Sequence, residues 1–157
     1  MKHNVTNVVI GGLGGQGVLK ASDILADLVF SAGLDVKKSE VHGMSQRGGS
    51  VSSDVRFGSN VYSPMVPPGE ADYLVVISSD QVPVNQAALA KEGILIDDSQ
   101  IDVSKLSNKK SVNVALLGVL SKHLDFSVDA WMAAILRNLP EKLHEVNQKA
   151  FLLGRSG

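Results

Sequence analysis

The chain has 157 residues, 44% of them hydrophobic and 20% charged, which is enough to bury one core and favours a single domain over residues 1–157. Its 15 Lys and Arg residues nearly balance 16 Asp and Glu residues, so it lacks the positive field on which nucleic-acid binding depends. Cysteine is absent, which excludes disulfides, thiolate-bound zinc and cysteine-held iron–sulfur clusters in this chain.

The distribution of apolar residues and histidines excludes further classes. No run of about 18 or more apolar residues occurs, and the apolar stretch near the N-terminus soon breaks into glycine, so neither a membrane span nor a signal peptide is predicted. The four histidines are scattered without the pairing of a metal site. We therefore expect a cytoplasmic protein with no membrane partner, no nucleic-acid partner and no metal site.

The first third of the chain predicts a strand, a helix and a second strand. β-branched residues from 5 to 10 form the strand, and the apolar stripe that follows predicts a helix ended by Gly33. A weaker strand pattern runs from Leu34 to about Val41. Residues 50–64 then alternate apolar and polar side chains around a Gly-Ser-Asn turn, which predicts a hairpin that is polar on one face.

The middle of the chain continues the alternation of strand and helix. Three prolines make the stretch PMVPPGE at residues 64–70 a rigid connector, and residues 71–78 form a continuous apolar strand. A helix is predicted from Asp80 to about Lys91, ended by Gly93 and followed by a buried strand with the sequence ILIDDS.

The last third, from Ser111 to about Leu152, is predicted to be helical, with breaks near residues 125–127 and at Pro140. Strands that alternate with helices indicate an α/β fold. We expect a Rossmann-like open, mostly parallel sheet with flanking helices, a β-hairpin insertion and a helical C-terminal third.

A glycine-rich loop follows the first strand and opens the first helix. Its sequence GGLGGQG places Gly12, Gly14 and Gly17 in the GxGxxG spacing of dinucleotide-binding folds. Free amides and the positive end of the helix dipole favour an anion there. The same glycines also suit a compact turn that packs helix on strand, and a full NAD site is the third alternative.

Neighbouring residues argue against two kinds of nucleotide site. A NAD site would have an acidic residue at the end of the second strand, about 20 positions on, whereas Asp35 begins that strand and Glu40 lies too far along the chain. A P-loop would have Lys and then Ser or Thr directly after Gly17, where this sequence has Val-Leu. Nucleoside triphosphate hydrolysis is therefore disfavoured.

A second glycine-rich stretch, EVHGMSQRGGS at residues 40–50, begins where the second strand should end. In a doubly wound sheet it would lie at the carboxyl edge beside the first loop, where ligands usually bind. Arg47 offers a planar fork for a carboxylate or phosphate, and His42 can donate or accept a hydrogen bond near neutral pH. Gly43, Gly48 and Gly49 allow a close backbone approach. A polar surface loop would have the same composition. No nucleophile with a base and an orienting group is identified, so no catalytic residue is assigned.

Other residues receive structural interpretations. Four apolar residues at helical spacing predict core or subunit contact: Trp131, Met132, Ile135 and Leu136. Asp97 and Asp98 follow the ILI strand and could meet a ligand, but helix capping or solvation is favoured. The sequence SNKK at residues 107–110 predicts a solvated turn.

The loop GGLGGQGV, followed by SEVHGMSQRGGSVSSDVRFG and VYSP, resembles the gamma subunit of 2-oxoacid:acceptor (ferredoxin) oxidoreductases. Within that family it is most similar to the small (beta) subunit of indolepyruvate oxidoreductase. The similarity extends over most of the chain, including VNVALLG at residues 112–118 and the terminal AFLLG. The chain is shorter than we expect for that branch.

The resemblance implies a subunit that completes an enzyme without holding its reactive centre. Such complexes oxidatively decarboxylate a 2-oxoacid on thiamine diphosphate, pass electrons through iron–sulfur clusters to ferredoxin and release the acyl group as a coenzyme A thioester. The thiamine site and the clusters lie on large partner subunits, which agrees with the absence of cysteine here. The implied substrate is indolepyruvate or a similar arylpyruvate.

The resemblance also implies that the domain packs near the active site and is associated with coenzyme A access. On that basis the candidate cofactor-binding residues are Gly12, Gly14, Gly15, Gly17, His42, Arg47, Gly48 and Gly49. The alternatives are a self-sufficient NAD-linked oxidoreductase and a stand-alone nucleotide or coenzyme A binding module. An obligate subunit leaves apolar partner surface uncovered, through which an isolated chain could form a homodimer.

Overall fold

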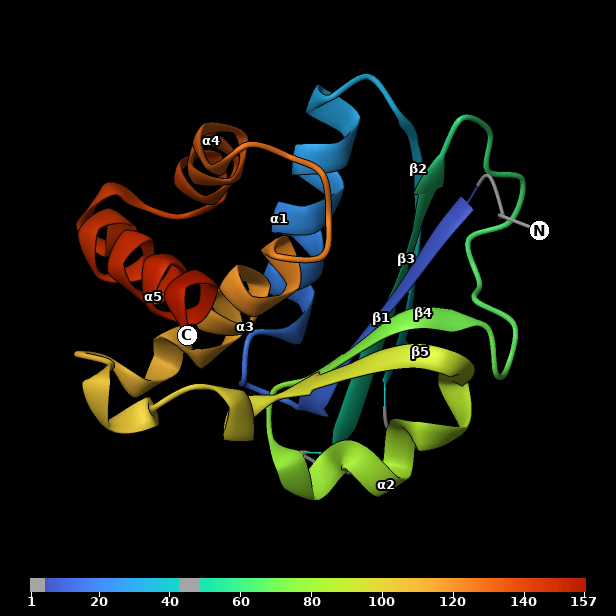
Figure 1. Cartoon of the computed structure of the whole chain (residues 1–157), viewed down its shortest axis with the longest axis horizontal. Helices are drawn as coiled ribbons and strands as arrows, with labels where there is room; N and C mark the ends of the chain where they lie inside the picture. The colour runs from blue at the N-terminus through green and yellow to red at the C-terminus, as the bar shows by residue number, and fades with distance from the viewer. Residues whose placement is uncertain (1–4, 43–48) are drawn as a thin grey trace.

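The computed structural model describes residues 5–42 and 49–157, which form an α/β fold around a five-stranded sheet (Figure 1). The strands are β1 (Val5–Leu13), β2 (Asp35–His42), β3 (Ser50–Gly58), β4 (Ala71–Val76) and β5 (Leu89–Asp97). The α-helices are α1 (Val18–Ser31), α2 (Val82–Asn85), α3 (Val112–Ser121), α4 (Val128–Asn138) and α5 (His144–Ser156).

The sheet is open and mixed, with the strand order β2-β3-β1-β4-β5. β1 pairs with β4 in parallel and β4 pairs with β5 in parallel, whereas β3 runs antiparallel to both β1 and β2. Every strand except β3 therefore runs in the same direction. The predicted fold class, an open and mostly parallel sheet with flanking helices and a helical C-terminal third, is confirmed.

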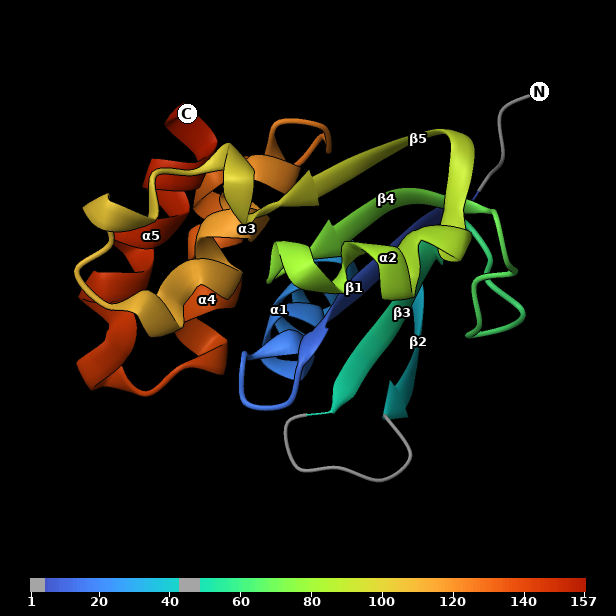
Figure 2. The same cartoon turned by 90° about the horizontal axis from the view of Figure 1, so that it is seen from below.

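The two faces of the sheet are covered by different elements (Figures 1 and 2). Helices α1, α3, α4 and α5 cover one face, and α2 lies on the other. In β1, Val8 and Ile10 join the large apolar cluster under the four helices, while Val9 packs with Leu74 on the face of α2. Because the helices after β1 and β4 lie on opposite faces, the carboxyl ends of these two strands form a topological switch point, where ligands of open α/β sheets bind.

The hairpin lies one strand earlier than the sequence indicated. β2 and β3 pair antiparallel, from Asp35 opposite Gly58 to His42 opposite Val51. Residues 59–62 form no strand, so the hairpin predicted over residues 50–64 is wrong. The physical reason is that β3 lies between β1 and β2, and both of its edges are already hydrogen-bonded.

The helix predicted after Asp80 is also shorter than expected. A 3₁₀ turn, α2 and a second 3₁₀ turn end at Ala88, and β5 follows at once. Gly93 does not end a helix: it lies in a bulged part of β5, where a Cβ would be 2.6 Å from the carbonyl oxygen of Ala71. Because β5 is an edge strand, only its residue Ile96 is fully buried, and the prediction of a buried strand was too broad.

The C-terminal helices pack tightly against one another. Trp131 of α4 and Phe151 of α5 are fully buried, with ring centroids 5.5 Å apart, as the apolar spacing predicted for Trp131. Gly154 allows α5 to cross α3 closely, because a Cβ at this position would collide with the carbonyl oxygen of Ala115. Within residues 5–42 and 49–157, no helix has both the length and the apolar character needed to cross a membrane.

The connector between β3 and β4, residues 59–70, is fixed to the sheet by charged side chains. Asp54 accepts a hydrogen bond from the amide of Val66 (2.9 Å), and Arg56 donates one to the carbonyl of Ser63 (2.9 Å). Burial raises the pKa of Asp54 above its ordinary value. These two bonds hold the connector to β3 at residues 63 and 66, and the rigidity expected from the prolines of residues 64–70 stays a prediction.

Candidate functional site

The glycine-rich loop forms the turn from β1 into α1, as predicted. Gly15 and Gly17 have φ angles of 87° and 83°, a left-handed conformation that side chains disfavour. Gly17 is the N-cap of α1 and, having no side chain, leaves the first amides of the helix without a side-chain cap. Gln16 closes the turn, because its side-chain oxygen accepts a hydrogen bond from the amide of Leu13 (2.7 Å).

Two glycines at the end of β1 make room for amide side chains of the same chain. A Cβ on Gly11 would lie 2.6 Å from Nδ2 of Asn85, and a Cβ on Gly12 would lie 2.8 Å from Oε1 of Gln16. Neither distance is possible for a real Cβ without a shift of the neighbour. A side chain at either position would therefore displace the end of an amide side chain that packs against the glycine.

Gly17 and Gly15 differ in their surroundings although their backbone conformations are alike. The side chain of Asn113, in the first turn of α3, donates a hydrogen bond to the carbonyl of Gly17 (3.1 Å), and a Cβ on Gly17 would overlap that side chain. At Gly15, no described atom lies within 4 Å of the Cβ position. The compact-turn interpretation thus accounts for Gly12 and Gly17, whereas Gly15 faces open space that a ligand could enter.

The two glycine-rich motifs meet at one edge of the sheet, as predicted for their described residues. The amide of Gly14 donates a hydrogen bond to the carbonyl of Gly49 (3.0 Å), directly before β3 begins. His42 ends β2 at the same edge. Figure 2 shows the turn between β1 and α1 beside the start of β3. The His42 side chain, Arg47 and Gly48 lie outside the described residues.

The start of β3 is joined to the segment after β4 by a hydrogen bond to a neutral amide side chain. Ser50 donates to the side-chain oxygen of Gln81 (2.8 Å), and Asn85 donates to the Gln81 carbonyl (2.8 Å). Sequence reasoning did not identify Gln81, Asn85 or Asn113. A signal existed for Asn113, which is the polar residue within the apolar run VNVALLG at residues 112–118.

Two hollows flank the glycine loop at this carboxyl edge. One, of about 420 Å³, lies on the β3 side and is lined by Leu13, Gly14, Gly15, Gly17, Val18, Leu19, Lys20 and Val51. The other, of about 280 Å³, lies on the β4 side and is lined by Gly15, Gln16, Ile77, Ser78, Asp98, Lys109, Lys110 and Val112. Gly15 lines both hollows, so the open space at its Cβ position adjoins a hollow on each side of the loop.

Within residues 5–42 and 49–157, no group of three or more His, Asp or Glu side chains could hold a metal ion. Two carboxyl groups outside this edge have shifted pKa values: a hydrogen bond from Arg137 lowers the pKa of Asp27, and burial raises the pKa of Asp54. Asp97 accepts a hydrogen bond from the amide of Ser99 (3.0 Å), the capping role predicted for it.

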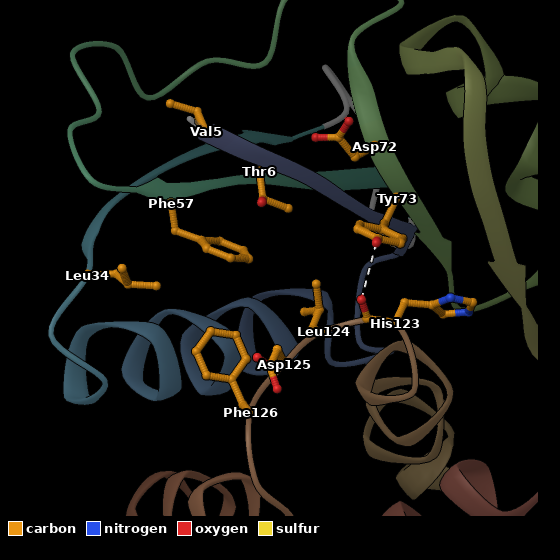
Figure 3. A pocket seen from close by; sticks show the side chains of 10 residues that line it. All are labelled: Val5, Thr6, Leu34, Phe57, Asp72, Tyr73, His123, Leu124, Asp125 and Phe126. Atoms are coloured by element: carbon orange, nitrogen blue, oxygen red, sulfur yellow. Dashed lines mark hydrogen bonds between the residues drawn. The ribbon is translucent and has the colours of Figure 1, made fainter. Parts of the chain in front are cut away.

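A larger hollow of about 690 Å³ lies at the opposite end of the sheet, where β1 begins (Figure 3). Phe57, Leu34 and Leu124 point into it, and Tyr73 donates a hydrogen bond to the carbonyl of His123 (3.3 Å) at its margin. Its lining is mixed, because Thr6, Asp72 and Asp125 border it beside these apolar side chains, and sequence reasoning did not predict it. The candidate site is placed at the carboxyl edge because the two glycine motifs meet there, not because of the size or polarity of the hollows.

Comparisons with known proteins agree with this fold and with the two motifs. The subunit IorB of indolepyruvate oxidoreductase from Pyrococcus horikoshii is 34% identical over 190 aligned positions, covering 94% of this chain and 93% of the relative. The aligned part of this chain, 94% of 157 residues, is about 148 residues, so about 40 of the 190 aligned positions are gaps in this chain. This agrees with the expectation that the chain is short for that branch of the family. The chain is similar in fold to the gamma subunit of a keto/oxoacid ferredoxin oxidoreductase from Geobacter sulfurreducens, with a TM-score of 0.81, 24% identity and 96% coverage of both chains.

A longer enzyme shares the same fold. The 2-oxoglutarate:ferredoxin oxidoreductase from Magnetococcus marinus, solved with 2-oxoglutarate, coenzyme A and succinyl-CoA bound, matches 99% of this chain with 31% of its own, at a TM-score of 0.81 and 17% identity. The family model described as pyruvate ferredoxin/flavodoxin oxidoreductase matches residues 7–157. This match spans nearly the whole chain and agrees with the resemblance carried by the two glycine motifs, and the chain belongs to the pyruvate ferredoxin/flavodoxin oxidoreductase family.

Proposed function

We propose that this chain is the small, gamma-type subunit of a 2-oxoacid:ferredoxin oxidoreductase whose substrate is indolepyruvate or a similar arylpyruvate. The observation that carries the proposal is the 34% identity to an indolepyruvate oxidoreductase subunit over nearly the full length of both chains. A ketoisovalerate oxidoreductase subunit from Methanothermobacter marburgensis is 32% identical over 118 residues, and that similarity covers less of this chain, 74%. The preference for an arylpyruvate follows from this difference in coverage.

In the proposed complex, the reactive centre lies on larger partner subunits. Thiamine diphosphate would remove carbon dioxide from the 2-oxoacid, iron–sulfur clusters would carry the electrons to ferredoxin, and coenzyme A would take up the acyl group. The absence of cysteine supports this division, because the chain has no thiolate to hold a cluster. We further propose that residues 1–157 form one domain, that the complex is cytoplasmic, and that the isolated chain is inactive and forms homodimers through its uncovered partner surface.

The carboxyl edge of the sheet is the proposed contribution of this chain to the site. Gly12, Gly14, Gly15, Gly17, His42, Arg47, Gly48 and Gly49 are proposed to line it toward an anionic group such as the phosphates of coenzyme A. The hydrogen bond between Gly14 and Gly49 supports this assignment, because it joins the two motifs at one rim. Gly12 and Gly17 would act indirectly, since their space is filled by protein side chains.

A self-sufficient NAD enzyme is less compatible with the geometry. Asp35, the acidic residue nearest the expected ribose position in sequence, lies at the start of β2, and its carboxylate accepts a hydrogen bond from the amide of Val61 (2.8 Å). This carboxylate is therefore at the far end of the strand from the glycine loop. Titration of the chain with NADH tests the alternative: saturable quenching of cofactor fluorescence would favour it.

The proposal is tested by assembly and turnover. The chain is co-expressed with a large subunit that carries thiamine and cluster motifs, and the purified complex is assayed for ferredoxin reduction with indolepyruvate and coenzyme A. We expect stable co-purification, turnover by the complex only, and a higher kcat/KM for indolepyruvate than for pyruvate, 2-oxoisovalerate or 2-oxoglutarate. Turnover of arylpyruvate by this chain alone, or failure to associate with any such subunit, would contradict it.

A further inference from the structure

We propose that the 280 Å³ hollow between the glycine loop and the start of α3 is a binding site for a phosphoryl group, with Lys109 and Lys110 as its cations. Residues 107–110 were expected to be a solvated turn, and neither lysine belongs to the two glycine motifs. The inference rests on the proposed function only for the identity of the natural ligand, because the phosphoryl chemistry follows from the lining residues themselves.

The hollow lies at the switch point of the sheet. Ile77 and Ser78 directly follow β4, and the amide of Ile77 donates a hydrogen bond to the carbonyl of Gly11 (2.9 Å), which closes the crevice between β1 and β4 from below. The opposite wall is formed by Gly15 and Gln16. A volume of about 280 Å³ corresponds to the liquid volume of about nine water molecules, so a phosphate with five heavy atoms fits in it.

The two lysines are held in place by their own turn. Asn108 accepts a hydrogen bond from the amide of Lys110 through its side chain (2.9 Å) and one from the amide of Ser111 through its carbonyl (3.0 Å). Within the described part of the chain, neither lysine forms an ion pair. Their charges are therefore available to a ligand, while the backbone that carries them is ordered.

A second contact fixes this turn relative to the glycine loop. Asn113, only 7% exposed, donates from its side chain to the carbonyl of Gly17 (3.1 Å) and accepts from the amide of Val114 (2.9 Å). Lys109 and Lys110 lie four and three positions before Asn113, respectively, so the same contact positions both walls of the hollow. Preorganisation of this kind is what a small anion site requires.

The electrostatic balance of the lining favours a multiply charged anion. Two lysines face one carboxylate, that of Asp98, which is already engaged as acceptor from the amide of Ser79 (3.2 Å). Among the described residues, none accepts a hydrogen bond from the amide of Gly15. Donors thus lie on both walls, which matches the three acceptor oxygens of a phosphoryl group better than the two of a carboxylate.

The test is a titration of the full chain followed by two-dimensional ¹⁵N NMR. Inorganic diphosphate is the first probe, and coenzyme A and NAD are added in parallel titrations. The variant is Lys109→Gln with Lys110→Gln, and the control is Lys91→Gln with Lys142→Gln, which removes the same charge at exposed positions outside the hollow. The spectra also report whether each variant is folded.

We expect diphosphate to shift the amides of Gly15, Gln16, Ser78 and Val112 in the wild-type chain. Loss of two charge-assisted hydrogen bonds should weaken its binding about tenfold or more in the Lys109/Lys110 variant. The control pair should change it by less than about twofold, since distant exposed charges are screened. Tighter binding of coenzyme A than of diphosphate would identify a nucleotide-type ligand, and equal binding would identify phosphate itself; both support the site.

The inference is overturned if these amides do not respond to any of the three probes, or if the control pair weakens binding as much as the Lys109/Lys110 pair. The outcome is separate from that of the proposed function. If the chain assembles with its large subunit but its amides at Gly15 and Ser78 do not respond, only the inference of a phosphoryl site is overturned. If the chain binds diphosphate but never assembles, the phosphoryl site is supported and the proposed function is overturned.

Discussion

Replacing Gly17 by alanine should destabilise the chain much more than the same replacement at Gly15. Both glycines have a left-handed backbone, with φ angles of 83° and 87°, so both substitutions carry the same conformational penalty of about 1–2 kcal/mol. The two positions differ in the space that is available for an added Cβ atom. The Cβ position of Gly15 is open, whereas that of Gly17 overlaps the side chain of Asn113.

The overlap cannot be relieved cheaply, because the Asn113 side chain is buried and is hydrogen-bonded at both of its polar atoms. Overpacking costs about 1–3 kcal/mol, and displacement of the amide loses a hydrogen bond worth about 1 kcal/mol. We therefore expect Gly15→Ala to lower the free energy of unfolding by about 1–2 kcal/mol and Gly17→Ala to lower it by about 3–6 kcal/mol.

Urea denaturation followed by circular dichroism measures both values. The double variant Gly17→Ala with Asn113→Ala removes the overlapping side chain, and its loss should fall short of the sum of the single losses by about 1 kcal/mol or more. Equal losses for the two single glycine variants, within about 0.5 kcal/mol, would refute the reasoning. It would mean that the Asn113 contact does not constrain the loop.

Two further predictions concern the helices. Gly154→Ala should force α3 and α5 apart at the Ala115 carbonyl, because the overpacking cost of about 3 kcal/mol exceeds the gain of about 1 kcal/mol in helix propensity. A lowered urea midpoint would show this loss of stability. A raised midpoint would argue against close contact of the two helices. Arg137→Gln should remove the partner that lowers the pKa of Asp27, at a loss of about 0.5–1 kcal/mol near neutral pH for this partly exposed pair. A lowered carboxyl pKa contributes its full stability above the ordinary value of 3.8 and loses it as the pH falls from 3.8 through the lowered value. The difference from wild type should therefore shrink below pH 3.8, and a constant difference would contradict the ion-pair account.

The elements with a strong local pattern could be predicted from the sequence. The strand, glycine turn and helix from Val5 to Ser31 were identified because a β-branched apolar run, the glycine spacing and the apolar stripe all lie within one short segment. The breaks between the C-terminal helices were found for the same reason. The meeting of the two glycine motifs was also predicted, because strands that run in the same direction end at the same edge of a sheet.

What could not be predicted depends on contacts between distant residues. The pairing of β3 with both β1 and β2 is set by tertiary contacts, and the alternation of residues 50–58 does not indicate which strands will be the partners. The sequence pattern around Gly93 predicts the end of a helix. In the structure, Gly93 instead allows β5 to lie close to the carbonyl of Ala71. The amides of Asn85 and Asn113 act on glycines about 75 and 96 positions away, so their roles require coordinates.

The reversed direction of β3 has a consequence for how much chain is needed to build a binding rim. In a doubly wound fold, each loop at the carboxyl edge is delivered by a strand and must be followed by a return helix of a dozen residues or so. Here the chain turns back through the sheet itself: one antiparallel strand returns it, and Gly49, directly before that strand, is hydrogen-bonded to Gly14 of the first loop. A short chain can in this way bring two segments together at one edge of a sheet without a second crossover helix.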